Sequence, residues 1–199
     1  MNDNITAFRQ GTRELAEEFS YPVILPSGTF VADARCAWLV EEIDDHLESN
    51  WKPRIRKGWF SASALGKTDD ELIAEYRGEA QDAPPAKLLR VFSVGNDRDH
   101  TYKGWLKAMG LSVVGGAKDR RIKIPHLRLQ GECDDVLRGP NGFVVYEGKT
   151  MNAYSFNKLD EPLAHHVQQV HVYMAGLALG HAGAIISYEC KNTQALRMF

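Results

Sequence analysis

Residues 134–149 constrain the fold of this chain most strongly, because apolar runs flank a turn-forming tetrapeptide there. The turn is Gly-Pro-Asn-Gly at residues 139–142, and the apolar run that follows it covers residues 143–146. Glycine and asparagine tolerate a positive φ and proline presets the corner of a turn, so this pattern is typical of a β-hairpin. We therefore predict two paired strands in this stretch.

The predicted hairpin carries two acids and a lysine. Asp134 precedes the first apolar run, whereas Glu147 and Lys149 end the second. Side chains alternate between the faces of a strand, so Glu147 and Lys149 point the same way. Carboxylate oxygens hold Mg²⁺ or Mn²⁺, and an ammonium group can steady a water molecule or a developing negative charge. An ordinary solvated strand end has the same residues, so the hairpin alone leaves both interpretations open.

The length and composition indicate a globular protein. We expect a single domain over residues 1–199, with a small lobe attached to its core. The 44% hydrophobic and 25% charged residues are ordinary for a soluble protein. No apolar run approaches the roughly 20 residues of a membrane span, and the N-terminus lacks the basic-then-apolar order of a signal peptide. We expect a cytoplasmic protein that does not bind membranes.

The three cysteines exclude two classes of stabilising site. Cys36, Cys133 and Cys190 are far apart and include no C-x-x-C pair. This spacing argues against a disulfide framework and against a cysteine-ligated zinc or iron–sulfur site. We predict buried, reduced thiols.

Charge is distributed unevenly along the chain. Residues 1–51 contain three basic and ten acidic residues, whereas residues 52–199 contain 21 basic and 16 acidic residues. Helical spacing of apolar residues predicts helices near residues 4–19 and 31–47, the second with Cys36, Leu39, Val40 and Ile43 on its apolar side. We interpret residues 1–50 as an acidic helical lobe and residues 51–199 as the core, which would carry any nucleic-acid surface.

Residues 51–63 combine cationic, aromatic and hydroxyl side chains. Cations suit phosphates and aromatic faces suit unstacked bases, so this segment is a candidate DNA contact. The alternative, a solvated basic loop whose aromatic residues anchor it to the core, remains open. The candidate contacts are Arg54, Arg56, Lys57, Trp59, Ser61 and Ser63.

Further elements follow from caps and periodicity. A helix is predicted from Thr68 or Asp69 to Arg77, and another over residues 85–109, bent or interrupted near Gly95. Strands are predicted over residues 127–137 and 184–190, with a short helix at the C-terminus. In the helix predicted over residues 163–179, one stripe carries three polar side chains four residues apart. These are His165, Gln169 and Tyr173.

Several motifs in order resemble those of the PD-(D/E)XK nucleases. Residues 131–134, 147–149 and 169–173 match G-x-x-D, (D/E)-x-K and Q-x-x-x-Y. The likeness is to the RecB-like branch, which includes phage exonucleases and CRISPR-adaptation nucleases, and the sequence from Gly95 to His100 resembles its upstream histidine motif. Ser61 and Ser63 resemble a serine segment of that branch, and residues 188–194 resemble a tail found in phage members. The iron–sulfur cysteines of some relatives and any helicase motif are absent.

This resemblance implies an α/β fold with a restriction-endonuclease-like core, in which a small mixed β-sheet is flanked by α-helices. It also implies that His100, Asp134, Glu147 and the carbonyl of Gly148 hold Mg²⁺ or Mn²⁺. An imidazole ligand would favour Mn²⁺. Lys149 would orient or help to deprotonate the attacking water, while Gln169 and Tyr173 would position the scissile strand. Lys191 would meet a phosphate, and Asp135 would face away from Asp134.

The resemblance therefore predicts a metal-dependent DNA exonuclease of phage type, acting in recombination, replication or DNA degradation. Two alternatives remain: a structure-specific endonuclease for flaps or junctions, and a DNA-binding module that has the fold without catalysis. DNA is the expected partner, together with a second copy of the chain or a recombination or replication protein.

Overall fold

The computed structural model describes residues 23–24, 30–31, 37–53, 55–79, 81–179 and 183–199. The chain divides into two compact units. The first contains Met1–Trp51 and Ala83–Leu89, and the second contains Lys52–Asp82 and Arg90–Phe199. The helix predicted near residues 4–19 lies outside the described residues.

The first unit contains a short hairpin and a helix. Strands β1 (Val23–Ile24) and β2 (Phe30–Val31) pair in antiparallel fashion, and α2 spans Ala37–Asn50. The prediction that a helix begins at residue 31 is wrong, because Val31 belongs to β2. Leu39, Val40 and Ile43 are exposed, so these three residues of the predicted apolar side are not buried in the described structure. Cys36 lies outside the described residues.

The second unit contains a four-stranded mixed sheet in the order β6-β7-β8-β9. Strands β6 (Asp135–Gly139) and β7 (Gly142–Met151) form the predicted hairpin, which is confirmed, and Gly142 has a φ of +127° that favours glycine. Strand β8 (Ala184–Cys190) runs parallel to β7, as a buried strand beside it. Strand β9 (Leu196–Met198) pairs antiparallel with β8, so the helix predicted at the C-terminus is wrong.

A second, three-stranded mixed sheet has the order β3-β5-β4. Strand β5 (Leu129–Glu132) lies between β3 (Phe60–Ser61), to which it is parallel, and β4 (Arg121–Ile124), to which it is antiparallel. One strand was predicted over residues 127–137, but the chain leaves the three-stranded sheet after β5 and enters the four-stranded sheet at β6. The structure is therefore α/β with two small mixed sheets flanked by helices.

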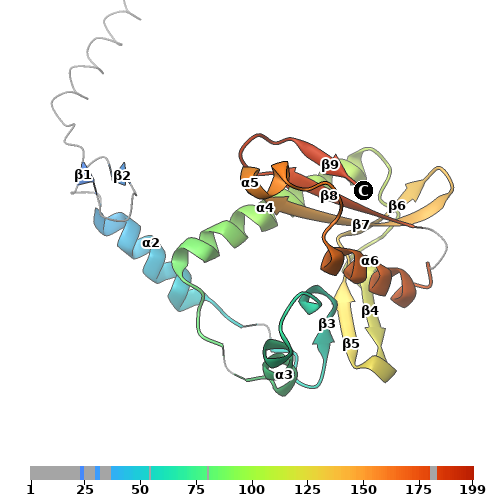
Figure 1. The fold of residues 1–199 in the computed structure, drawn as a ribbon, viewed down its shortest axis with the longest axis horizontal. Coiled ribbons are helices and arrows are strands. Elements are labelled where there is room, and N and C mark those ends of the chain that lie inside the picture. The colour runs from blue at the N-terminus through green and yellow to red at the C-terminus, as the bar shows by residue number, and fades with distance from the viewer. Residues whose placement is uncertain (1–22, 25–29, 32–36, 54, 80, 180–182) are drawn as a thin grey trace, which may run out of the picture. The chain divides into compact units, whose positions relative to one another are not determined.

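Helices cover both faces of the four-stranded sheet (Figure 1). Helix α4 (Ala86–Ala108) is continuous through Gly95, and its Leu106 packs with Tyr146. Helix α6 (Ala164–Gly176) packs on the other face, where Val170 contacts Ile186. These helices confirm the predictions for residues 85–109 and 163–179 in type and approximate bounds, although α4 is not interrupted.

The shorter helices follow their local signals. Helix α3 (Asp69–Arg77) begins with a capping box between Thr68 and Glu71 and ends at Gly78, whose φ is +70°. Helix α5 (Ala153–Asn157) begins after Asn152. The chain also contains three short 3₁₀ helices among the described residues: η2 (Ala62–Ala64), η3 (Ala117–Arg120) and η4 (Pro125–Leu127).

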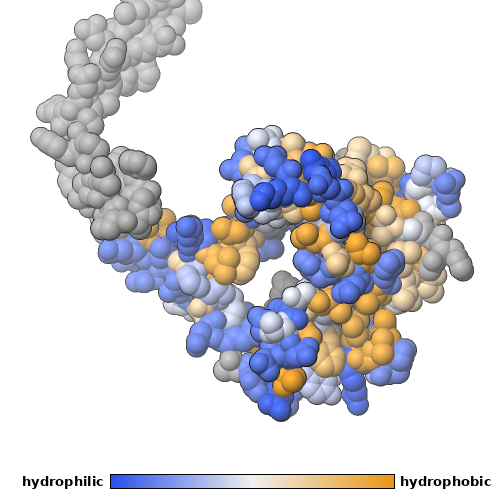
Figure 2. All heavy atoms as spheres, in the orientation of Figure 1, coloured by the Kyte–Doolittle hydropathy of each residue, from blue (hydrophilic) through white to orange (hydrophobic). Residues whose placement is uncertain are grey.

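The core of the second unit joins the two sheets through α6. Buried Ile122, Leu129, Val145 and Tyr173 belong to one apolar cluster. On the face drawn in Figure 2, apolar residues gather around α6 and β4, while polar residues cover α5. Cys133 and Cys190 are buried and unpaired, as predicted for them, and no helix among the described residues is long and apolar enough to cross a membrane.

Candidate active site

Strand β7 places two of the predicted catalytic side chains on one face of the four-stranded sheet. Glu147 and Lys149 share the face that α6 covers, because one residue separates them along the strand. Lys149 Nζ lies 2.6 Å from Glu147 Oε1. The Glu147 side chain is only 4% exposed and the Lys149 side chain 23%, so the pair joins a buried acid to a base that still reaches solvent.

The amide of Gln169 on α6 holds this pair in place. Its Nε2 donates to Glu147 Oε1 at 2.9 Å and to Tyr173 Oη at 2.8 Å, and its Oε1 accepts a hydrogen bond from Lys149 Nζ at 3.2 Å. Gln169 and Tyr173 meet because they are four residues apart on one helix. Both are buried. They therefore position Glu147 and Lys149, whereas the resemblance implied direct contact with the scissile strand.

Gly131 allows β5 to lie close to α6. A Cβ atom at this position would lie 2.8 Å from both Tyr173 Cε1 and Ala62 Cβ, which is closer than carbon atoms pack. The glycine of the G-x-x-D motif thus has a packing role. It makes room for the Tyr173 ring three residues before Asp134.

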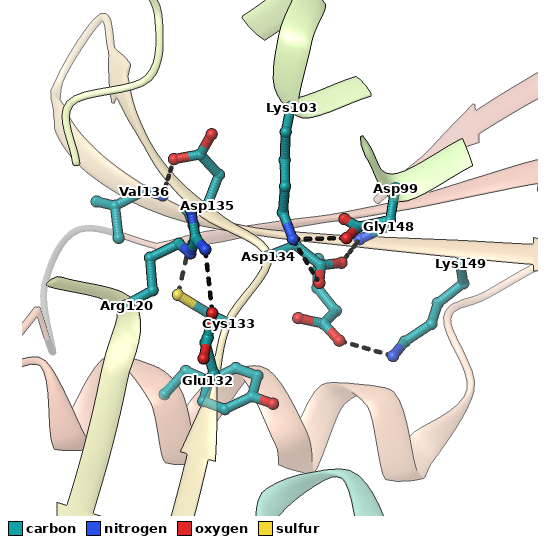
Figure 3. Close-up of polar contacts among 12 residues, drawn as sticks. Asp99, Lys103, Arg120, Glu132, Cys133, Asp134, Asp135, Val136, Gly148 and Lys149 are labelled. Atoms are coloured by element: carbon teal, nitrogen blue, oxygen red, sulfur yellow. Dashed lines mark hydrogen bonds and ion pairs between the residues drawn. The ribbon is translucent and has the colours of Figure 1, made fainter. Parts of the chain in front are cut away.

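Asp134 lies at an open edge of β7. The β6–β7 register begins with Asp135 opposite Tyr146, so beyond that pair β7 is bonded to β8 on one side and has no described strand on the other. The carboxylate of Asp134 occupies this edge, where its Oδ2 accepts a hydrogen bond from the backbone N–H of Gly148 at 2.7 Å (Figure 3). The N–H and C=O of one strand residue point to the same side, so the Gly148 carbonyl faces this edge too.

The carboxylates of Asp134 and Glu147 lie close enough to repel each other. Burial first, and then the negative charges of Glu147 and Asp99, raise the pKa of the Asp134 carboxyl from 3.8 to about 7, against the opposing charge of Lys103. Burial also raises the pKa of Glu147. Among the described residues, Glu147 Oε2 is buried and has no hydrogen-bond partner. The site therefore combines repulsion between two carboxylates with a buried Glu147 oxygen that lacks a hydrogen-bond partner among the described residues.

Helix α4 supplies two charged groups that the sequence analysis missed. Lys103 Nζ lies 2.6 Å from Asp99 Oδ2 and 3.9 Å from Asp134 Oδ1 (Figure 3). The spacing of an acid and a lysine four residues apart on the helix that carries the histidine motif could have indicated this pair. His100, the residue after Asp99, is exposed.

The donor set fits a hard divalent cation in part. Carboxylate and carbonyl oxygens are the ligands that Mg²⁺ and Mn²⁺ take in proteins, and Asp134, Glu147 and the Gly148 carbonyl supply them here. The open oxygen of Glu147 and the repulsion between the acids fit such a cation, which would neutralise both. In the described part of the chain, no three His, Cys, Asp or Glu side chains gather closely enough to hold a metal, so the structure does not bring His100 to the two acids.

Another buried acid, Glu189, lies on the opposite face of the sheet from Glu147. Glu189 on β8 pairs in register with Thr150 of β7 and is 3% exposed. Its Oε1 lies 3.1 Å from Arg98 Nη2 of α4. This ion pair attaches α4 to the sheet one residue before Asp99.

The residues predicted to contact DNA divide between surface and core. Arg54 lies outside the described residues. Lys57 is exposed and Arg56 is half-buried. Trp59 is half-buried, and Lys123 Nζ lies 4.3 Å from its ring centroid, so a cation already covers one face of the indole.

The two serines of this segment form one unit. Ser61 is buried and pairs in register with Gln130 of β5, whereas Ser63 is exposed in η2. Their hydroxyl oxygens lie 2.8 Å apart. Only Ser63 is therefore open to a phosphate. Lys191 is half-buried where β8 ends, and its backbone N–H donates to the carbonyl of Met151 at 2.8 Å.

Comparisons with known proteins give little. No family model matches this chain, and no curated protein matches it. Among solved structures, the chain resembles one titled "Crystal structure of SSO0001", with a TM-score of 0.45 and 18% identity over 82% of this chain and 76% of that chain. We draw no argument from a likeness of this degree.

Proposed function

We propose that this chain is a divalent-metal-dependent deoxyribonuclease with a restriction-endonuclease-like core, acting as an exonuclease on DNA. One observation carries the proposal. Glu147 on β7 has one oxygen bound to Lys149 and Gln169, and its other oxygen is buried and has no hydrogen-bond partner in the part of the chain that the structure describes; Asp134 lies beside it, at the open edge of the same strand. A structural ion pair would gain nothing from a second, repelling carboxylate, whereas a cation site requires it.

The chain's own residues supply orientation and charge. A divalent cation bound at this site would lower the pKa of a water molecule and neutralise charge on the phosphoryl oxygens. Lys149 keeps its ammonium group at the solvent side of Glu147, where it can hold a water or a phosphate oxygen by hydrogen bonding. Gln169 is a positioning residue, because it fixes both partners of the Lys149–Glu147 pair.

The proposal of DNA as substrate rests on charge and on the motif series. Residues 52–199 carry five more basic than acidic residues, which favours a polyanion. Lys57 and Ser63 are exposed in the segment that the sequence analysis selected for DNA contact. The choice of an exonuclease over an endonuclease rests on the resemblance of the motif series to phage exonucleases.

The test is cleavage of defined DNA substrates by the purified full-length chain. Linear single-stranded and double-stranded DNA, labelled at either end, and a closed circle are incubated with Mg²⁺, with Mn²⁺ or with a chelator. We expect progressive loss of the linear DNA with metal, no loss in chelator and an intact circle. The position of the label that is released first gives the polarity.

The matched variants are Lys149→Ala and Lys158→Ala. We expect Lys149→Ala to abolish cleavage while leaving the circular dichroism spectrum and DNA binding unchanged. Lys158 is exposed and its ammonium group contacts Tyr154, away from the candidate active site, so its variant should cleave normally. Cleavage of flaps, junctions or circles by the wild type would indicate a structure-specific endonuclease. Binding of DNA without cleavage of any linear, flapped or branched substrate would refute the enzyme and favour the binding module.

A further inference from the structure

The ammonium group of Lys103 lies between two acids of the candidate active site. It contacts Asp99 at 2.6 Å and Asp134 at 3.9 Å, and its side chain is 26% exposed. Figure 3 shows Lys103 reaching down from α4 toward both carboxylates. No role in the chemistry described above uses this residue.

Each of the two candidate metal ligands, Asp134 and Glu147, has a lysine of its own. Lys149 binds Glu147 on the α6 side of β7, and Lys103 approaches Asp134 from the α4 side. The two lysines differ in which carboxylate oxygen they approach and in how the other oxygen of that acid is bonded. Lys149 binds Glu147 Oε1, and the other oxygen of that acid has no hydrogen-bond partner among the residues that the structure describes. Lys103 approaches Asp134 Oδ1, which is the oxygen that Gly148 does not use.

Lys103 is held in this place by its helix. The Arg98–Glu189 ion pair attaches α4 to β8, and Leu106 packs against Tyr146 of β7. Lys103 lies between these two attachment points, and its contact with Asp99 is an i,i+4 pair on the same helix. The ammonium therefore cannot move far from Asp134 without breaking its bond to Asp99.

We propose that Lys103 is the resident counter-ion of this site: it neutralises Asp99 and Asp134 in the metal-free protein and competes with a divalent cation for Asp134. The inference rests on the proposed function. Lys103 then acts as a positioning residue that sets the metal affinity, since two cations near one carboxylate repel each other. Repulsion between two unit charges about 4 Å apart near a protein surface can weaken cation binding by up to about a thousandfold. Because Lys103 is partly exposed, we expect its effect on the metal dissociation constant to be about tenfold.

The test compares three substitutions on α4 in the full-length chain. Lys103→Met removes the positive charge and keeps most of the side-chain length. Lys103→Gln replaces the ammonium with a neutral polar group, and Lys103→Arg retains the positive charge. Lys107→Met is the matched control, because Lys107 is an exposed lysine one turn further along α4. Mn²⁺ affinity is measured by calorimetry at one pH and ionic strength, and the melting temperature is measured in chelator.

We expect Lys103→Met and Lys103→Gln to bind Mn²⁺ about tenfold more tightly and to melt at a lower temperature in chelator, because the acids lose their counter-ion. Lys103→Arg and Lys107→Met should bind within about threefold of the wild type. A lysine that only packs would lower the melting temperature without tightening Mn²⁺ binding, and that result would overturn the inference.

The outcome also separates this inference from the proposed function. If the wild type binds Mn²⁺ and cleaves DNA but both neutral variants bind no more tightly, only the role of Lys103 is refuted. If neither the wild type nor the variants bind Mn²⁺, the metal-dependent function and this inference fail together.

Discussion

The substitution Asp134→Asn should remove the fall in stability with rising pH that Asp134 imposes on the metal-free protein. Asparagine is nearly isosteric with aspartate, and its Oδ1 can still accept the hydrogen bond that Gly148 donates to Asp134. What the variant loses is the negative charge. Its effect on the free energy of unfolding therefore reports the cost of ionising Asp134 in the folded protein.

The magnitude follows from the pKa of Asp134. A rise from 3.8 to about 7 corresponds to on the order of 4 kcal/mol, at about 1.4 kcal/mol per pKa unit. This figure is an upper bound, because the side chain is 22% exposed and water screens part of the repulsion. We expect the measured difference to be about half of it.

The sign follows from where the proton is bound. Between pH 4 and pH 7 the folded protein keeps a proton on Asp134 that the unfolded chain has released, so wild-type stability falls as pH rises through this window. Above about pH 7 the folded form is ionised too and the full penalty is present. Asp134→Asn has no such penalty, so its advantage over the wild type should grow from pH 4 to pH 7 and then stay constant.

Urea unfolding in chelator, followed by tryptophan fluorescence from pH 4.5 to pH 8.5, measures this difference. Asp160→Asn removes a charge from an exposed carboxyl and serves as the control. A difference between Asp134→Asn and the wild type that is constant across this range would contradict the reasoning. So would an Asp134→Asn variant that is the less stable protein at pH 8.5 in chelator.

Two further predictions concern packing and hydrogen bonding in the same unit. Gly176→Ala should destabilise the protein by about 1–3 kcal/mol, because the added Cβ would lie 2.6 Å from Ile122 Cβ. Gly104→Ala should instead stabilise α4 by about 0.5–1 kcal/mol, because a Cβ added there would have no atom within 4 Å. Equal unfolding midpoints for these two variants in urea would contradict the packing argument. Tyr188→Phe should lower the free energy of unfolding by about 1–3 kcal/mol. The Tyr188 hydroxyl lies 2.8 Å from Nδ1 of His166, and burial lowers the pKa of that imidazole to about 3. Unchanged stability of Tyr188→Phe by the same method would show that this hydrogen bond contributes nothing.

Local signals were sufficient for the elements that the sequence predicted well. The hairpin at residues 139–142 follows from its turn residues, and α3 follows from its capping box and terminal glycine. The meeting of Glu147 with Lys149 follows from strand alternation. In each case the information lies within a few residues of the element itself.

The missed features depend on contacts between distant parts of the chain. Strand β3 has two residues, which is too short for a periodic pattern, and it exists because Phe60 and Ser61 pair with β5 almost seventy positions later. The rotation of α4 about its own axis is also non-local. Neighbouring residues on a helix point about 100° apart, so the Arg98–Glu189 contact decides whether Asp99 or His100 faces the acids. The sequence places both residues near the site and cannot choose between them.

The separation of the two sheets, which the sequence did not predict, explains why the site is open. Had residues 127–137 formed one long strand beside β7, its earlier residues would have paired with Glu147, Gly148 and Lys149. The chain instead joins β5 to a different sheet and reaches β7 only at Asp135, so that the edge of β7 beyond Tyr146 is left without a described strand. Asp134 lies at the point of departure and binds the backbone N–H that a strand partner would have taken. The same break in pairing thus delivers the first acid and exposes the strand that carries the second.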